Sequence, residues 1–177
     1  LPLANKAADT TRIAIVNHII KSFIFHDTNL IKIKFITIQK KTNFVFRKNE
    51  LDMKEEALNL PYMGNSMETH LGIEFLPTDE DGTVHAEMPV DHRTCQPYGT
   101  LNGGASLALA ESVAGFGSLH LCAPNEFAVG MQVSGNHIST VKVGNKVIAS
   151  GKLIHKGSNT HIWNVDIHTT TGKLVSS

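Results

Sequence analysis

The segment from Gly103 to about Leu121 constrains the fold most, because it predicts one long helix made almost entirely of small apolar residues. A helix of this kind must be covered over most of its surface. Strand-like segments joined by tight turns, such as residues 143–146, follow it, and strands joined by such short turns pair antiparallel. An antiparallel sheet curled around the helix meets both demands, which predicts an α+β domain.

The other expected elements all lie after Met53. We expect a short helix at 53–60, two strands at 70–77 and 82–90 joined by an Asp-Gly turn, and a loop at 91–100. Beyond the long helix we expect four antiparallel strands, at 127–144, 145–157, 160–170 and after Gly172. Expected core residues are Met88, Met131 and Trp163, whereas Phe116 fits either an acyl pocket or the underside of the sheet. His92 and Arg93 are expected to be solvated.

The first fifty residues differ in composition from the rest. They hold nine Lys/Arg against three Asp/Glu, a balance of +6, whereas residues 51–177 have a balance of −6. Their Ile, Lys, Asn and Phe residues alternate over short stretches, with no turn signal and no clear partner strand. We interpret residues 1–52 as an atypical extension, non-native or disordered and translated from upstream of a start at Met53, and residues 53–177 as the domain. A targeting presequence, interrupted by Asp9 and Asp27, and a nucleic-acid arm without a basic patch are the alternatives.

Composition narrows the class of protein. With 41% hydrophobic and 18% charged residues the chain is typical of a globular protein, and no apolar run reaches the length of a transmembrane helix. Cys95 and Cys122 form no CxxC motif and are interpreted as reduced thiols of a cytoplasmic protein. The ten histidines form no compact ligand pattern, and the neighbours His155 and His161 are interpreted as polar residues at strand ends. We therefore expect no metal and no cofactor.

One acid, Glu111, lies in the middle of the apolar helix, with no basic residue three or four positions away. A carboxylate there is costly to bury unless it is paired across an interface or hydrated, and Gly115 opens space beside it. At the helix start, the N–H groups of Gly103 and Gly104 lie at the positive end of the helix dipole and would stabilise an oxyanion. These elements are roughly 10–12 Å apart along one helix. Taken separately, a glutamate in a helix is usually a surface residue and a glycine pair before a helix is usually part of a loop. Together, the two features favour an active site shared by antiparallel helices of a dimer.

Three stretches resemble the hotdog-fold acyl-CoA thioesterases: MPVDHRTCQPYGTLNGGASLALAES, VGMQVSGNHIS and HKGSNTHIWNVDI. The resemblance is nearest to the 1,4-dihydroxy-2-naphthoyl-CoA hydrolases of menaquinone biosynthesis and to the phenylacetic-acid-degradation-type thioesterases. It implies a hotdog fold, in which a sheet wraps a central helix, and a homodimer or homotetramer. It also implies hydrolysis of an aromatic or medium-length acyl-CoA, with no metal, nucleic-acid or membrane partner.

The resemblance also implies roles for individual residues. Glu111 matches the family's catalytic carboxylate, which acts as nucleophile or general base. Gln96 matches the glutamine that positions the thioester or the attacking water, and Gly103 matches the glycine whose N–H polarises the thioester carbonyl. The segments implied to line the coenzyme A side of the cleft contain Asn136, His137, Gly157 and Ser158.

Two positions depart from the family pattern. Asn102 stands where the family usually has His, and it can hold the turn by hydrogen bonds but cannot titrate near neutral pH. Gly115 stands where a polar residue is common, and the family's last strand runs beyond Ser177, so the C-terminal strand is expected to be truncated. Asn102 keeps open a non-catalytic acyl-CoA-binding hotdog domain. A hotdog dehydratase or isomerase is a third interpretation, although no His/Asp or His/Glu pair is well placed for it.

Overall fold

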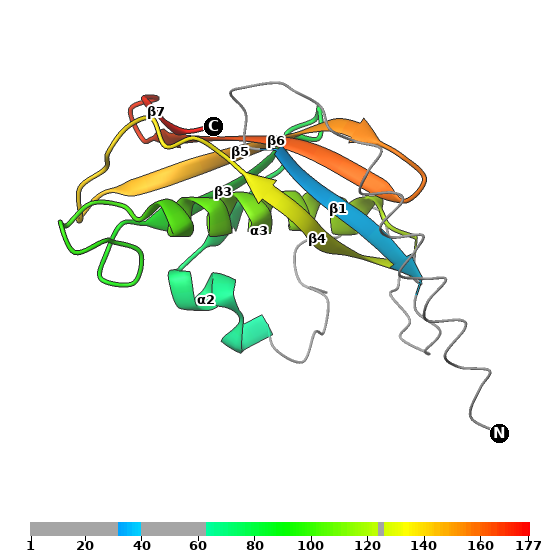
Figure 1. Cartoon of the computed structure of the whole chain (residues 1–177), viewed down its shortest axis with the longest axis horizontal. Coiled ribbons are helices and arrows are strands. Elements are labelled where there is room, and N and C mark those ends of the chain that lie inside the picture. The colour runs from blue at the N-terminus through cyan, green and yellow to red at the C-terminus, as the bar shows by residue number, and fades with distance from the viewer. Residues whose placement is uncertain (1–31, 40–62, 124–125) are drawn as a thin grey trace.

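The computed structural model describes residues 32–39, 63–123 and 126–177. A long helix lies against a curled antiparallel sheet (Figure 1), which confirms the predicted α+β architecture. The elements in chain order are β1 (Lys32–Gln39), the short 3-10 helix η1 (Met63–Asn65), α2 (Met67–Leu71), β2 (Glu74–Leu76), β3 (Val84–Pro89), α3 (Gly103–Leu121), β4 (Glu126–Ser134), β5 (Lys146–Lys156), β6 (Thr160–Thr169) and β7 (Leu174–Ser176).

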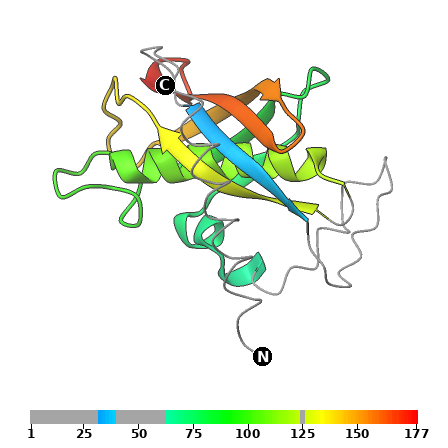
Figure 2. The ribbon, with the colours of Figure 1, turned by 45° about the vertical axis from the view of Figure 1, so that its right-hand side comes forward.

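The seven strands form one sheet in the order β2-β3-β5-β6-β1-β4, and β7 pairs with β6 beside β1. Every pairing is antiparallel. Figure 2 shows β1 and β4 crossing in front of α3 while β5 lies behind it, so the sheet curls around the helix. The helix α2 lies on the other side of α3, where the Ser112 hydroxyl donates to a Glu68 carboxylate oxygen at 3.0 Å.

The helix α3 has the predicted bounds and buries one stripe against the sheet. The stripe recurs every three or four residues, as one face of a helix requires, and consists of Ser106, Leu109, Ala110, Val113, Ala114, Gly117 and Ser118. The predicted core residue Trp163 packs on Gly117, where a Cβ would overlap the indole, and donates its Nε1–H to Ser118 Oγ at 2.8 Å. Within the described ranges, no helix is long and apolar enough to span a bilayer.

The strand β1 comes from the segment predicted to be an extension. It pairs with β6 on one side and with β4 on the other, so the expectation of no partner strand is wrong. Ile33 and Phe35 point into the core with 1% and 4% of their surface exposed. Both partners lie more than eighty residues away along the chain, and a local pattern cannot show pairing over such a separation.

The helix expected over 53–60 lies outside the described residues. Three other expectations, which concern two strands and one core residue, need correction. The predicted strand 70–77 begins later, because Ser66 caps α2 and Gly72 ends it in the left-handed conformation at φ 70°. The predicted strand 127–144 ends at Ser134. Met88 is buried as predicted, but Met131 is 36% exposed on β4.

Candidate active site

The N-terminal end of α3 is built by Asn102 and the glycine pair that follows it. Asn102 has an extended backbone, and its Oδ1 accepts the Gly104 N–H at 2.8 Å, so it is the N-cap. Its own N–H donates to the Thr94 carbonyl at 2.9 Å, which fixes the cap to the preceding loop. The Gly103 N–H is the first of the helix and has no intrahelical acceptor, and no other described group accepts it. This N–H is therefore available to a ligand oxygen.

A cleft of about 230 Å³ opens beside this helix end, and among its lining residues are Gln96, Gly103 and His137. The His137 imidazole lies where a Cβ on residue 103 would stand, so the absence of a side chain on Gly103 lets the ring lie over the helix end. His137 Nδ1 is 3.1 Å from the hydroxyl of buried Ser176 on β7, which holds the ring over the helix end. The structure therefore brings together three residues that the sequence had singled out, although they come from three separate segments.

The loop 91–101 that carries Gln96 is held by an Asp-Arg pair. The Arg93 side chain donates to both Asp91 carboxylate oxygens, and these hydrogen bonds, with the guanidinium charge, lower the pKa of Asp91 to about 2. Arg93 is exposed, as predicted, and forms an ion pair with Asp91, and His92 is 87% exposed. The Gln96 side chain donates its Nε2–H to Thr100 Oγ1 at 2.8 Å, and the Gln96 backbone carbonyl accepts the Gly99 N–H.

Glu111 lies on the exposed side of α3, where its carboxylate contacts Gly130 of the edge strand β4. A Cβ on residue 130 would overlap Glu111 Oε1. Glu111 is eight residues beyond Gly103, or roughly 12 Å along the axis at 1.5 Å per residue. Within one chain the carboxylate therefore does not reach the cleft at the helix start.

The part of α3 that follows Glu111 packs against β1 and β2. Gly115 leaves room for the Phe35 ring, which is 3.4 Å from the position of an added Cβ. Phe116 stacks on Phe75 of β2 with ring centroids 4.3 Å apart and lies 4.4 Å from the His120 ring. It packs against a strand of the sheet and against the hydrophobic core, which agrees with the second of its two predicted places.

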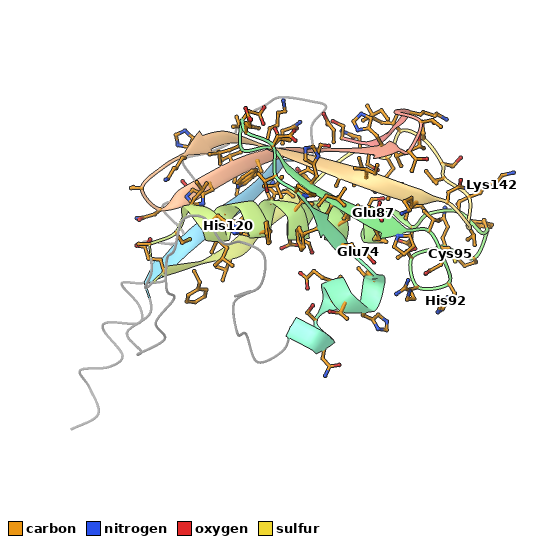
Figure 3. All side chains as sticks on the ribbon, turned by 180° about the vertical axis from the view of Figure 1, so that it is seen from behind. Glu74, Glu87, His92, Cys95, His120 and Lys142 are labelled. Atoms are coloured by element: carbon orange, nitrogen blue, oxygen red, sulfur yellow. The ribbon has the colours of Figure 1, made fainter. Side chains whose placement is uncertain are left out.

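The segments predicted to line the coenzyme A side lie at opposite ends of α3 in one chain. Asn136 and His137 lie at the N-terminal end, where the Asn136 N–H donates to the Ser177 carbonyl at 2.8 Å. Gly157 and Ser158 form the β5–β6 turn, which lies beyond the C-terminal half of α3. Figure 3 marks the two ends, with Cys95 and Lys142 at the first and His120 at the second. One chain does not bring these predicted residues together.

Sequence reasoning missed Gly130, which leaves room for the Glu111 carboxylate, and Ser176, whose hydroxyl is hydrogen-bonded to His137. Neither carries a sequence signal: a glycine in a strand and a serine near the chain end are common, and their importance comes from contacts across the fold. Cys95 and Cys122 form no disulfide within the described residues, which agrees with the prediction of reduced cysteines. Among the described residues, no group of three His, Cys, Asp or Glu side chains could hold a metal ion.

Comparison with known proteins places the chain in a family. The family model described as Thioesterase superfamily matches residues 98–176, from the loop before α3 through β7. The 1,4-dihydroxy-2-naphthoyl-CoA hydrolase of Escherichia coli strain K12 is 40% identical over 123 residues, which are 69% of this chain and 88% of the relative. The chain belongs to the thioesterase superfamily. It is a thioesterase, which confirms the enzyme class predicted from the sequence.

Solved structures confirm the hotdog fold of this thioesterase. A Haemophilus influenzae thioesterase is 41% identical with a TM-score of 0.60, covering 63% of this chain and 77% of its own. A Staphylococcus aureus thioesterase is 33% identical with TM-scores of 0.57 and 0.58, and the alignments cover 62% and 63% of this chain and 89% and 91% of that one. The two S. aureus structures are of variants in which a glutamine or a glutamate is replaced by alanine, and these two residues are 15 positions apart.

Proposed function

We propose that this thioesterase hydrolyses an acyl-CoA thioester to the free acid and coenzyme A through Glu111, Gln96 and Gly103. The observation that carries the proposal is a pair of groups on α3: the Gly103 N–H, which no described group accepts, and the exposed Glu111 carboxylate beside Gly130. A second observation supports the choice of Gln96 and Glu111 as site residues. Gln96 and Glu111 are 15 positions apart, the same spacing as the glutamine and glutamate replaced in the S. aureus variants.

The proposed reaction breaks the C–S bond of the thioester and forms a C–O bond to water. Glu111 takes a proton from the attacking water, and the carbonyl oxygen becomes an oxyanion that accepts the Gly103 N–H. The positive end of the α3 dipole stabilises that charge. The proton then passes to the departing coenzyme A thiolate, while Gln96 holds the thioester or the water in line. As a nucleophile, Glu111 would instead form an acyl anhydride that water then hydrolyses.

We infer that two copies of the chain share each site. One chain leaves Glu111 and Gly103 roughly 12 Å apart, so the two groups meet only if antiparallel α3 helices from two copies lie side by side. The exposed side of α3 supports this arrangement, because Glu111 lies there and Leu107, one turn before it, is an apolar side chain that is only half-buried. A second copy would bury that apolar surface, in a homodimer or in a homotetramer of two dimers.

The same pairing accounts for the split coenzyme A segments. With antiparallel helices, Asn136 and His137 of one copy lie at the same end as Gly157 and Ser158 of the other. Ser158 and His137 are exposed and present hydrogen-bonding side chains to a phosphate or to the pantetheine arm. Gly104 and Asn102 hold the helix start next to them, and Gly115, one turn beyond the carboxylate, packs on the Phe35 ring.

The proposed substrate is an aromatic or medium-length acyl-CoA, with 1,4-dihydroxy-2-naphthoyl-CoA as the first to test. The E. coli relative carries that name at 40% identity. Such a substrate would give this thioesterase a role in menaquinone biosynthesis. Asn102 supports one second candidate, an acyl-CoA-binding protein without turnover, because a residue that cannot titrate holds the helix start.

A thiol-release assay with a panel of acyl-CoAs, including the dihydroxynaphthoyl and benzoyl thioesters, tests the proposal. Glu111→Ala should lower kcat by roughly 100-fold or more, because it removes the general base or nucleophile. The matched control is Glu74→Ala, which removes an exposed glutamate from β2. A Glu111→Ala rate equal to that of the parent would contradict the assignment, and tight acyl-CoA binding without thiol release would favour the binding protein.

A further inference from the structure

A second group of reactive side chains lies on the face of the sheet that points away from α3. His85 of β3 and Ser150 of β5 are opposite each other in the β3–β5 pairing, so they share one face. Gly151, the residue after Ser150, faces α3, because a Cβ there would overlap the Val113 side chain. Successive residues of a strand point to opposite faces, so Ser150 and His85 point away from the helix. This group is therefore separate from the proposed thioesterase site.

The His85 imidazole lies between a carboxylate and a hydroxyl. Its Nε2 is 2.8 Å from Asp79 Oδ2, and its Nδ1 is 2.9 Å from Ser150 Oγ. The side chain of His85 is 21% exposed, that of Asp79 is 60% exposed, and Ser150 is half-buried. The three side chains thus form one continuous hydrogen-bonded chain that solvent reaches.

The order of these three groups fixes the direction of both hydrogen bonds. An ionised carboxylate can only accept, so the hydrogen of a neutral His85 ring lies on Nε2 and is donated to Asp79. The lone pair then lies on Nδ1, where it accepts the hydrogen of the Ser150 hydroxyl. A serine that donates to an imidazole held by a carboxylate is the arrangement that activates a hydroxyl as a nucleophile. The ring nitrogens are used in the opposite order from that of the serine-protease triad, but the roles of base and carboxylate are the same.

The fold holds each of the three residues in place. Asp79 lies in the turn between β2 and β3, where its N–H donates to the Thr83 carbonyl at 3.0 Å and its own carbonyl accepts the Gly82 N–H at 2.9 Å. His85 and Ser150 lie on β3 and β5, each of which has a neighbouring strand on both sides. The base and the hydroxyl are therefore carried by the interior of the sheet, and the carboxylate by a hydrogen-bonded turn.

A cation lies on the same face. Lys152 is two residues after Ser150 on β5, so its side chain points to the same side of the sheet. Its Nζ is 3.6 Å from Asp81 Oδ2, and its side chain is 67% exposed. A long, exposed side chain with such a loose ion pair is free to turn its ammonium group toward negative charge that develops next to Ser150.

We propose that Ser150 is a second nucleophile, which takes the acyl group of a small activated ester, with His85 as its general base and Asp79 as the residue that positions the ring. Ser150 Oγ forms a bond to the ester carbonyl carbon, and the bond between that carbon and the leaving oxygen breaks. The Ser150 proton passes to His85 Nδ1 and then to the leaving oxygen. Lys152 stabilises the negative charge on the carbonyl oxygen. This inference does not depend on the proposed thioester hydrolysis.

Acetylation by p-nitrophenyl acetate tests the inference. The full chain carries Glu111→Ala, so that hydrolysis at the proposed thioesterase site does not consume the ester, and the modified residue is located by peptide mass spectrometry. We expect release of nitrophenolate and an acetyl group on Ser150, and Ser150→Ala should remove that adduct. Ser134, an exposed serine of β4, is the internal control and should stay unmodified.

The roles of base and carboxylate have their own readouts. His85→Phe keeps a ring but no base, so the rate of Ser150 acetylation should fall at least about 10-fold. In Asp79→Asn the amide donates to Nε2, which moves the ring hydrogen to Nδ1 and removes the acceptor of the serine hydroxyl. Nitrogen NMR of the His85 ring should therefore show the hydrogen on Nε2 before the substitution and on Nδ1 after it.

Three results would overturn the inference. These are a Ser150 that stays unmodified in the chain with the relay intact, equal acetylation rates with and without His85→Phe, and a His85 ring hydrogen on Nδ1 when Asp79 is present. The first and third are read with Asp79, His85 and Ser150 all in place, so they decide the question even if a relay variant does not fold. Hydrogen exchange of the β3 and β5 amides shows whether His85→Phe and Asp79→Asn keep the sheet.

Discussion

Gly130 gives a direct test of how the fold places the Glu111 carboxylate. In Gly130→Ala the new methyl would occupy the position of Glu111 Oε1, so the carboxylate must move. Alanine in a strand is favoured over glycine by roughly 0.5–1 kcal/mol. A displaced, off-rotamer glutamate costs about 0.5–1.5 kcal/mol. The two terms nearly cancel, so the free energy of unfolding should change by less than about 1 kcal/mol.

The rate should respond far more than the stability. A reacting group misplaced by about 1 Å can lower the rate by about 100-fold, and we expect a loss of that order in kcat/KM by thiol release. Gly64→Ala is the matched control, because no atom lies within 4 Å of its added Cβ. In a Glu111→Ala background no carboxylate has to move, so Gly130→Ala should raise the free energy of unfolding, measured with urea, by the whole of the roughly 0.5–1 kcal/mol by which a strand favours alanine over glycine. A Gly130→Ala enzyme with the parent rate would refute the reasoning, as would the same stability change in both backgrounds.

Two further predictions concern stability. Burial, together with the charge of Lys156, lowers the pKa of His161 below its ordinary value. The unfolded chain therefore takes up the proton first, so stability is full above pH about 6.5 and falls as the pH drops through the folded-state pKa. In His161→Leu the free energy of unfolding, measured with urea, should fall less as the pH is lowered. An unchanged pH dependence of that free energy would count against the role given to His161. Asn102→Ala should cost about 1 kcal/mol through loss of the N-cap while Asn102→Asp keeps it; equal unfolding midpoints for the two variants would argue against the cap.

The parts of the fold that the sequence predicted well are those set by local signals. The bounds of α3 follow from Asn102 and the glycine pair at its start, and the β2–β3 hairpin follows from the Asp-Gly turn, where Gly82 has φ 81°. The buried Trp163 follows from strand alternation. In each case the signal lies within a few residues of the feature.

The parts that failed depend on contacts between distant segments. The local pattern of β1 resembles a strand, but its partners lie across the whole domain. Met131 was expected in the core because it is apolar, yet β4 is an edge strand and leaves it exposed. The position of His137 over Gly103 depends on Ser176, near the other end of the chain. No pattern in the sequence marks these contacts in advance.

Subunit complementation tests the central claim, a site shared by two copies, most directly. Glu111→Ala and Gln96→Ala proteins, each with little thiol release alone, are mixed under conditions that exchange subunits. Random exchange makes half of the dimers mixed, each with one intact site of two, so activity should recover to roughly a quarter of the parent value. Mixed dimers that form, as native mass spectrometry would show, but release no more thiol than either variant alone would contradict the shared site.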